Sequence, residues 1–245
     1  MHSRKFKLAV VVGILAFAAV IFMFSPFFHL SEIVISGYNT VSRREIEERI
    51  GADFTTNLLF FNTGAARRRA MENLYIADVT FRRDLPGRLY VQVRERRLAA
   101  FVEHTPGSFL YIDEQGRVLE VRPFTAQPLP IVEGLNFTRF ALGELLEVAD
   151  STAFNIVTLY AQLIYRHGLA CRVTHINVSD TANTRILVGH VEFNVGGLRD
   201  AEMKVRIIVG MLDEMPEIEH VHAIVDLRNV DLRETRGEFI FEILT

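Results

Sequence analysis

The sequence has a single cysteine, Cys171, among its 245 residues, and it has no tryptophan. A chain with one cysteine cannot form an internal disulfide, so its fold must rest on a hydrophobic core. Cys171 directly follows the small and apolar residues Gly168, Leu169 and Ala170. We therefore expect Cys171 to be a small buried residue of that core.

Strong net charge is also missing. The 27 basic and 30 acidic residues give a net charge of −3, which provides no electrostatic footprint for nucleic acid. Basic residues are nevertheless concentrated between Arg82 and Arg97, where six arginines face only Asp84 and Glu95. We interpret this stretch as a solvated strand face. Attraction to anionic lipid or to an acidic partner is the alternative.

The motifs of common catalytic and metal sites do not occur. There is no H-E-x-x-H, no G-x-S-x-G, no Walker loop and no paired C-x-x-C. His190 and Glu192 resemble half of a zinc-deaminase signature, but the P-C-x-x-C half is absent. His220 and His222 are predicted to share a strand face without a third ligand. We therefore predict no enzyme activity and no catalytic, cofactor-binding or metal-ligating residue.

One long apolar run is present, from Leu8 to Phe28. It follows three basic residues, Arg4, Lys5 and Lys7. As a helix this run reaches about 30 Å, which is the thickness of a bilayer core. Because basic residues favour the cytoplasmic side, residues 1–7 are predicted to be a cytoplasmic tail. Residues from His29 onward are then expected outside the cytoplasmic (inner) membrane.

A cleaved signal peptide is the rival interpretation of this run. Such a signal needs a shorter apolar core followed by a small-x-small cleavage site. Ala16 and Ala18 have the right size, but they lie in the middle of the run. The bulky residues Phe27 and Phe28 stand where small residues belong. The sequence therefore favours an uncleaved, single-pass transmembrane helix at residues 8–28.

The residues that follow predict a small domain with the element order βααββ. The expected elements are a strand at His29–Ser36, helices at 42–51 and Thr63–Leu74, and strands at 77–82 and 89–93. Ser42 and Glu45 have the spacing of a capping box, and Gly51 suits the end of the first helix. Pro86 and Gly87 predict the turn between the last two strands. Val79 and Phe81 share the apolar phase of their strand and are expected to face the two helices.

The rest of the chain predicts a β-rich region with two helices, so that the fold class is α+β. Asp113 to Gly116 forms the expected turn of a hairpin, which explains Asp113 by turn chemistry. The expected helices lie at Ser151–His167 and Asp200–Met215, and the later strands at 173–178, 185–188, 192–195, 222–227 and 239–244.

Three stretches of this sequence resemble the FtsQ/DivIB family of bacterial cell-division proteins. They are Ser31–Gly37 leading into Val41–Ile46, then Arg83–Phe101, and then Tyr111–Leu119 with Leu129–Ile131 and Ile224–Arg228 further on. The first is similar to the opening of a POTRA domain, and the second to the junction between POTRA and β domains. The chain departs from the family pattern at Leu98, where proline is frequent, and in lacking the tryptophan that often precedes the position of Pro86.

The resemblance implies a POTRA domain at residues 29–96 and a β domain at residues 97–245. It also implies a non-enzymatic scaffold of the divisome at the division septum. The implied partners are small coiled-coil membrane proteins of the FtsB/DivIC and FtsL type, through which the septal peptidoglycan synthase is recruited or regulated. The alternatives are a POTRA-bearing secretion component that binds extended polypeptides, and an anchored envelope hydrolase using Asp113 or Cys171.

The last apolar stretch is the predicted partner contact. It consists of Phe239, Ile240, Phe241, Glu242, Ile243 and Leu244. The stretch is apolar on both faces, and a last strand is often an edge strand that invites pairing with another chain. Two alternatives stay open: the strand is central, or the Asp200–Met215 helix covers its second face.

Overall fold

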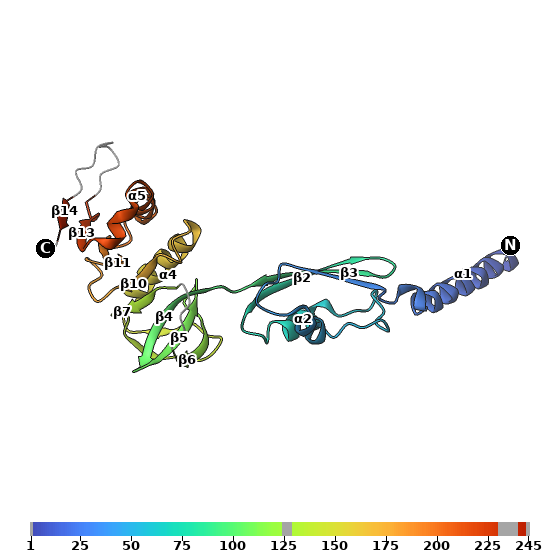
Figure 1. Ribbon diagram of the computed structural model, residues 1–245. Coiled ribbons are helices and arrows are strands. Elements are labelled where there is room, and N and C mark those ends of the chain that lie inside the picture. The colour runs from blue at the N-terminus through green and yellow to red at the C-terminus, as the bar shows by residue number, and fades with distance from the viewer. Residues whose placement is uncertain (1, 124–128, 230–239, 244–245) are drawn as a thin grey trace. The chain divides into compact units, whose positions relative to one another are not determined.

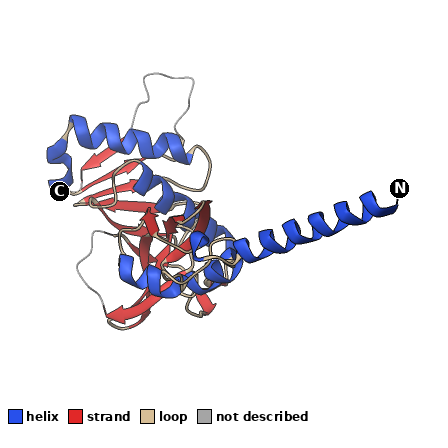
Figure 2. Ribbon diagram, turned by 90° about the vertical axis from the view of Figure 1, so that its right-hand side faces the viewer, coloured by secondary structure: helices blue, strands red, loops and turns tan. Residues whose placement is uncertain are grey.

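The computed structural model describes residues 2–123, 129–229 and 240–243, and the side chains of residues 6–123 and 129–229 (Figure 1). The chain divides into two compact units, Met1–Arg96 and Arg97–Thr245. Each unit combines helices with a sheet (Figure 2). The predicted α+β class, with an N-terminal apolar helix before a small α+β domain and a β-rich region, is confirmed.

The N-terminal helix α1 spans His2–Met23. Its Phe6–Met23 portion is long and apolar enough to cross a membrane. The helix begins and ends earlier than predicted, and Pro26 starts a separate 3-10 turn, η1 (Pro26–Phe28). The Ser25 hydroxyl caps that turn by accepting a hydrogen bond of 3.2 Å from the Phe27 N–H. Five residues beyond Met23 that were predicted as helix therefore form a turn and a 3-10 segment instead.

The first sheet has the order β1-β3-β2 and carries two helices. Its elements are β1 (Glu32–Ser36), α2 (Arg43–Ile50), α3 (Thr63–Ala70), β2 (Ile76–Asp84) and β3 (Arg88–Glu95). Strand β1 pairs parallel to β3, and β2 pairs antiparallel to it. The alternate residues Leu89, Val91 and Val93 of β3 are buried in one cluster with Ile46 and Ile50 of α2. The predicted βααββ order is therefore confirmed.

Helix α2 begins and ends where the sequence predicts. The Ser42 hydroxyl accepts a hydrogen bond of 3.2 Å from the Glu45 N–H, and Gly51 ends the helix with a φ of 65°. The second half of the capping box does not form. The Glu45 carboxylate instead accepts hydrogen bonds from Arg49 (3.0 Å) and Asn73 (2.7 Å). Asn73 lies in the turn that follows α3, within hydrogen-bonding distance of Glu45.

Helix α3 ends at Ala70, four residues earlier than predicted. The Asn73 side chain accepts a hydrogen bond of 2.8 Å from the Tyr75 N–H, which stabilises a turn where the helix was expected to continue. A bulge between Ile76 and Asp78 then brings both Ile76 and Val79 into the core. Not all of α3's arginines are simply solvated, because Arg69 donates to the Arg49 and Ile50 carbonyls at the end of α2.

The second unit is built on a sheet that has nine strands among the described residues, in the order β14-β13-β12-β11-β10-β7-β4-β5-β6. In chain order the strands are β4 (Leu98–Thr105), β5 (Ser108–Asp113), β6 (Val118–Pro123), β7 (Ile131–Glu133), β10 (Val173–Asn177), β11 (Arg185–Val188), β12 (Val191–Asn194), β13 (Ala223–Asp226) and β14 (Ile240–Ile243). A two-stranded ribbon pairs β8 (Phe137–Arg139) with β9 (Glu147–Val148). Strands β4 and β7 to β9 were not predicted, because their residues show no long alternation.

Helices α4 (Ser151–Arg166) and α5 (Ala201–Glu214) bury one face of this sheet. The helix residues Ile156, Tyr160 and Ile208 share one core cluster with Phe193 and Val225 of the strands. The predicted helix Asp200–Met215 extends one residue too far at its C-terminal end. Met215 is 46% exposed, because α5 ends at Glu214 and Pro216 begins the 3-10 turn η2 (Pro216–His220).

The side-chain alternation of β2 can be tested by its effect on the core of the first unit. Val79 is buried, whereas Phe81 is half-buried and packs edge-on against Phe61, with ring centroids 5.9 Å apart. Phe81→Ala should therefore cost roughly 2 kcal/mol, less than the ~3–5 kcal/mol of a fully buried phenylalanine. Arg82→Ala removes only an exposed stack on the Tyr90 ring and should cost less than about 1 kcal/mol. Urea unfolding of residues 29–245 measures both, and equal losses would show that the phase is wrong.

Glu95 holds the loop between β1 and α2 in place. Its carboxylate accepts hydrogen bonds from the backbone N–H groups of Asn39 (3.0 Å), Thr40 (2.8 Å) and Val41 (2.9 Å). Burial raises the pKa of Glu95, but the hydrogen bonds from Thr40, Val41 and Asn39 outweigh it and hold the pKa below its ordinary value.

A pH series can test this anchor. Because the pKa of Glu95 is lowered in the folded state, its stabilisation is present at neutral pH and is lost as the pH falls through the folded-state pKa. We expect Glu95→Gln to lower the free energy of unfolding at pH 7 by about 1–2 kcal/mol. The difference from the unmutated protein should shrink below about pH 4. A difference that stays constant with pH would contradict the role of the charge.

Candidate partner-binding surface

The C-terminal strand β14 lies at one end of the sheet of the second unit. It pairs antiparallel with β13, with Ala223 opposite Ile243, Ile224 opposite Glu242, Val225 opposite Phe241 and Asp226 opposite Ile240. In the part of the chain that the structure describes, no strand pairs with its outer edge. A strand with one unpaired edge presents N–H and C=O groups to a further strand. The alternative of a central strand therefore does not apply to the described sheet.

Four of the six predicted contact residues lie on this strand, and the other two lie outside the described residues. Ile240, Phe241, Glu242 and Ile243 form β14. Phe239 and Leu244 lie outside the described residues. The register aligns Phe241 and Ile243 with Val225 and Ala223, both of which are buried. Whether these residues contact a partner is taken up below as a proposal.

Polar contacts organise the strand that β14 pairs with. At the end of β13, the Asp226 carboxylate forms an ion pair of 2.6 Å with Arg228, which also donates to the Asn183 side chain at 2.6 Å. The hydrogen bonds from Arg228 hold the pKa of Asp226 below its usual range. Beneath this end of the sheet, the buried Lys204 of α5 donates to the Val195 carbonyl at 2.6 Å. These contacts fix the chain around the end of β13, the strand on which β14 is formed.

Two histidines that are far apart in sequence meet beside this surface. The rings of His190 and His222 lie 4.6 Å apart between centroids, and both residues are exposed. His220 does not share a strand with His222 as predicted, because it ends η2 while His222 precedes β13. Sequence reasoning missed the His190–His222 pair, since only the parallel pairing of β12 with β13 brings them together. No group of three potential metal ligands occurs among the described residues.

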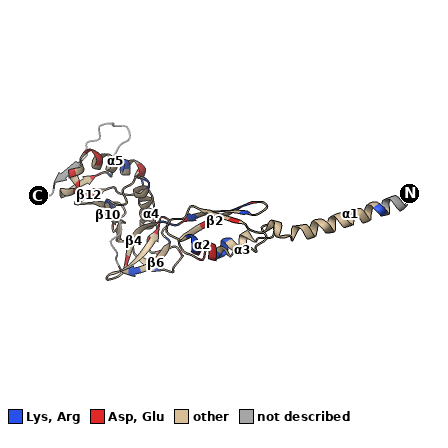
Figure 3. Ribbon diagram, turned by 45° about the vertical axis from the view of Figure 1, so that its right-hand side comes forward, with Lys and Arg blue, Asp and Glu red and all other residues tan. Residues whose placement is uncertain are grey.

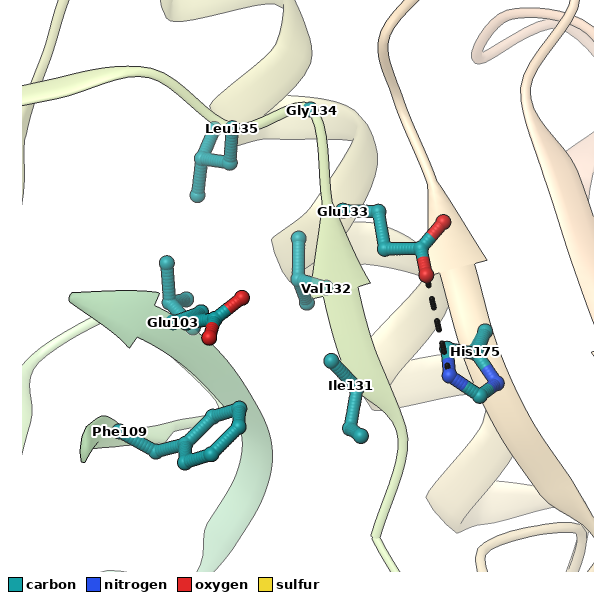
Figure 4. Close-up of a pocket in the computed structure, with 9 residues that line it drawn as sticks. Glu103, Phe109, Ile131, Val132, Glu133, Gly134, Leu135 and His175 are labelled. Atoms are coloured by element: carbon teal, nitrogen blue, oxygen red, sulfur yellow. Dashed lines mark ion pairs between the residues drawn. The ribbon is translucent and has the colours of Figure 1, made fainter. Parts of the chain in front are cut away.

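A hollow of about 550 Å³ opens elsewhere in the same unit, between β4, β7 and β10 (Figure 4). Its lining includes Phe109, Ile131 and the acidic Glu103, and its imidazole, His175, lies 3.8 Å from the Glu133 carboxylate. The residues that line it include no serine, threonine, cysteine or lysine that could act as a nucleophile. The described lining residues therefore offer no hydroxyl, thiol or amine nucleophile, and the ionisable groups among them are Glu103, Glu133 and His175.

The two residues considered for hydrolysis are explained by local structure. One oxygen of Asp113 accepts hydrogen bonds from the Gln115 N–H (2.8 Å) and the Arg117 N–H (2.9 Å), as the predicted turn requires. Cys171 is exposed, so the prediction of a buried thiol is wrong. It lies in the turn between α4 and β10, where Leu169 rather than Cys171 enters the core.

Charged residues are distributed without a single dominant patch. Figure 3 shows acidic and basic residues interspersed over both units, whereas α1 carries almost none beyond its first turns. The arginines of β2 and β3 are consistent with a solvated strand face, as Arg82 and Arg94 are exposed. Direct pairing through the backbone is therefore the binding mode for which the described sheet offers the clearest geometry.

Comparison with known proteins agrees with this architecture. The model of the "POTRA domain, FtsQ-type" family matches residues 28–96. The chain is 22% identical to the cell division protein DivIB of Clostridium tetani over 194 residues, which cover 79% of this chain and 73% of the relative. It is 23% identical to DivIB of Clostridium botulinum (strain Hall) over 76% of this chain and 73% of that protein.

An FtsQ protein also matches, over a shorter region. The chain is 31% identical to the cell division protein FtsQ of Bradyrhizobium diazoefficiens over 110 residues, which cover 44% of this chain and 32% of that protein. The predicted resemblance is thereby confirmed: an FtsQ-type POTRA domain is matched at residues 28–96, and the chain is similar to DivIB cell division proteins over most of its length and to an FtsQ protein over 110 residues.

Proposed function

We propose that this protein is a non-enzymatic, single-pass membrane scaffold of the bacterial divisome. The observation that carries the proposal is the similarity to DivIB cell division proteins over 79% of the chain. The apolar helix α1 is consistent with membrane anchoring, and the basic residues before it favour a cytoplasmic N-terminus. Both folded units are then extracytoplasmic, at the division septum.

The proposed activity is binding by strand addition at the outer edge of β14. The partners are coiled-coil membrane proteins of the FtsB/DivIC and FtsL type, through which the protein helps to recruit or regulate the septal peptidoglycan synthase. Backbone hydrogen bonds along the edge supply affinity, and side chains on alternate faces supply specificity. Support comes from the position of β14 at the end of the sheet and from its pairing register.

The orientation can be tested with protease. In intact spheroplasts, an added protease should remove nearly all of the chain beyond residue 28, because both units are proposed to lie outside the cytoplasmic membrane. An immunoblot against each end of the chain measures the result, and detergent-lysed spheroplasts provide the control for access. Full protection of the C-terminal end in intact spheroplasts would contradict the proposed orientation.

The binding edge can be tested by proline substitution. In an antiparallel pair, successive residues point their N–H groups alternately toward the neighbouring strand and away from it. Of Phe241→Pro and Glu242→Pro, one removes an N–H that points toward β13 and so breaks a hydrogen bond within the sheet. The other removes an N–H that points away from β13, toward the unpaired edge, and leaves the sheet intact. We expect the outward substitution to leave thermal stability nearly unchanged while abolishing capture of the coiled-coil partner in a crosslinking pull-down from membranes.

The opposite edge of the same sheet offers a matched control. Strand β6 ends the sheet on the far side and already contains Pro123, and Val121 lies two residues earlier in the same phase. Val121→Pro should therefore leave both stability and partner capture intact. If every proline in β14 that weakens capture also unfolds the second unit, or if Val121→Pro weakens capture equally, the edge-strand site is wrong.

A further inference from the structure

A loop of the POTRA domain is joined to the segment that leaves the apolar helix. The segment is residues 23–30, and the loop is residues 53–60. Three hydrogen bonds connect them: Asn57 Nδ2 to the Met23 carbonyl (2.8 Å), the Leu58 N–H to the Phe28 carbonyl (2.9 Å) and the Leu30 N–H to the Thr56 carbonyl (2.9 Å). The two stretches run antiparallel. Later residues of the loop therefore lie closer to the end of α1.

At its closest approach the loop places a phenylalanine beside the helix end. The Phe60 ring stacks on the Phe24 ring, with centroids 4.7 Å apart and an angle of 19° between the planes. Phe60 is 51% exposed and Phe24 is 64% exposed. The neighbours of Phe60 face the other way, because Leu58 and Phe61 are buried in the domain core. Residues 58–60 form a turn in which the Phe60 N–H donates to the Asn57 carbonyl at 3.2 Å, and Phe60 is the exposed residue between the buried Leu58 and Phe61.

A second group of aromatic rings lies at the same end of α1. Phe22, Phe27 and Phe28 contact one another, with centroid separations of 5.1 to 5.5 Å. Phe27 and Phe22 are more than half exposed in the isolated chain. Phe22, Phe24, Phe27 and Phe60 are thus all exposed rings at this end of α1, which gives it an apolar surface. Such a surface on a soluble domain would mark a contact with something apolar.

The length of α1 sets the depth of this surface. From Leu8, the first residue after the basic flank, to Met23 the helix reaches only about 24 Å, which is less than the ~30 Å of a bilayer core. The residues just after Met23 must therefore lie within the outer part of the bilayer or at its interface. Because Phe60 is in ring contact with Phe24, it lies at nearly the same depth.

We propose that residues 57–60 of this POTRA-domain loop form a second membrane contact, in which Phe60 inserts at the boundary between the lipid acyl chains and headgroups. The occupant of this surface is the bilayer that α1 crosses, since the surface is continuous with the proposed span. The inference rests on the proposed membrane anchoring. It implies that residues 29–96 are held at the outer surface of the membrane, because the Phe24–Phe60 stack and three hydrogen bonds join the loop to the helix end.

The absence of tryptophan makes this inference directly measurable. Single-tryptophan variants of the full chain, reconstituted in phospholipid vesicles, report the depth of each position by quenching with brominated lipids. Phe60→Trp tests the loop. Leu15→Trp, in the middle of α1, tests the span itself. Tyr38→Trp is the aqueous control, because Tyr38 follows the far end of β1, which lies about 13 Å along the strand from its start near α1.

The expected pattern distinguishes the loop from the span. Phe60→Trp should show blue-shifted emission and be quenched most by lipids brominated near the top of the acyl chain. Leu15→Trp should be quenched most by lipids brominated near the bilayer centre, and Tyr38→Trp should not be quenched. If Leu15→Trp is quenched while Phe60→Trp behaves like Tyr38→Trp, the loop inference is overturned and the span stands. If Leu15→Trp is not quenched, the proposed anchoring itself fails.

The unmutated chain provides a second measurement that does not depend on any substitution. A lipid-soluble photoactivated carbene reagent in the same vesicles should label the peptide that contains residues 57–60 as well as α1. It should leave the peptide that contains Tyr38 unlabelled. Labelling confined to α1 would overturn the inference. Labelling of the 57–60 peptide only at high protein-to-lipid ratios would assign the surface to a second copy of the chain, which also overturns it.

Discussion

Burial of one sheet face by two helices is the interaction on which the second unit depends. The chain has one cysteine, so no internal disulfide can compensate for a weak core. Helices α4 and α5 place Ile156, Tyr160 and Ile208 against the inward residues of the strands. Burial of apolar surface on this scale is the dominant favourable term in folding. It fixes the sheet firmly enough that an end strand can remain unpaired on its outer side.

Under the proposed function, that arrangement separates the residues that stabilise the fold from the edge that binds a partner. The core lies between the sheet and the helices, whereas the outer edge of β14 contributes no described pairing to the sheet. Polar contacts stabilise β13, the strand that pairs with β14. They include the Asp226–Arg228 ion pair and the hydrogen bond of the buried Lys204. A partner strand can then be added without rearranging the core, which is the advantage of binding through an edge strand.

The POTRA domain solves a different problem, which is how to fix loops beside a short sheet. Glu95 at the end of β3 satisfies three backbone donors between β1 and α2, and Arg69 satisfies carbonyls at the end of α2. At the other end of the domain, Asn57 and Leu58 bind the chain that leaves α1. The domain is therefore tied at both ends by hydrogen bonds to otherwise unpaired backbone groups, and one of those ends carries the aromatic surface with Phe60.

Local sequence patterns determined much of this protein. The apolar run, the Ser42 cap, the Gly51 end, the alternation of Leu89, Val91 and Val93, and the later helices follow from periodicity and turn chemistry, which act within a few residues. Only the tertiary structure decided which distant residues meet. The β14 edge, the His190–His222 pair, the Phe24–Phe60 stack and the exposure of Cys171 depend on strand order and loop packing. Contacts between residues far apart in the chain leave no periodic signal in the sequence, because their partners are chosen by the packing of whole elements.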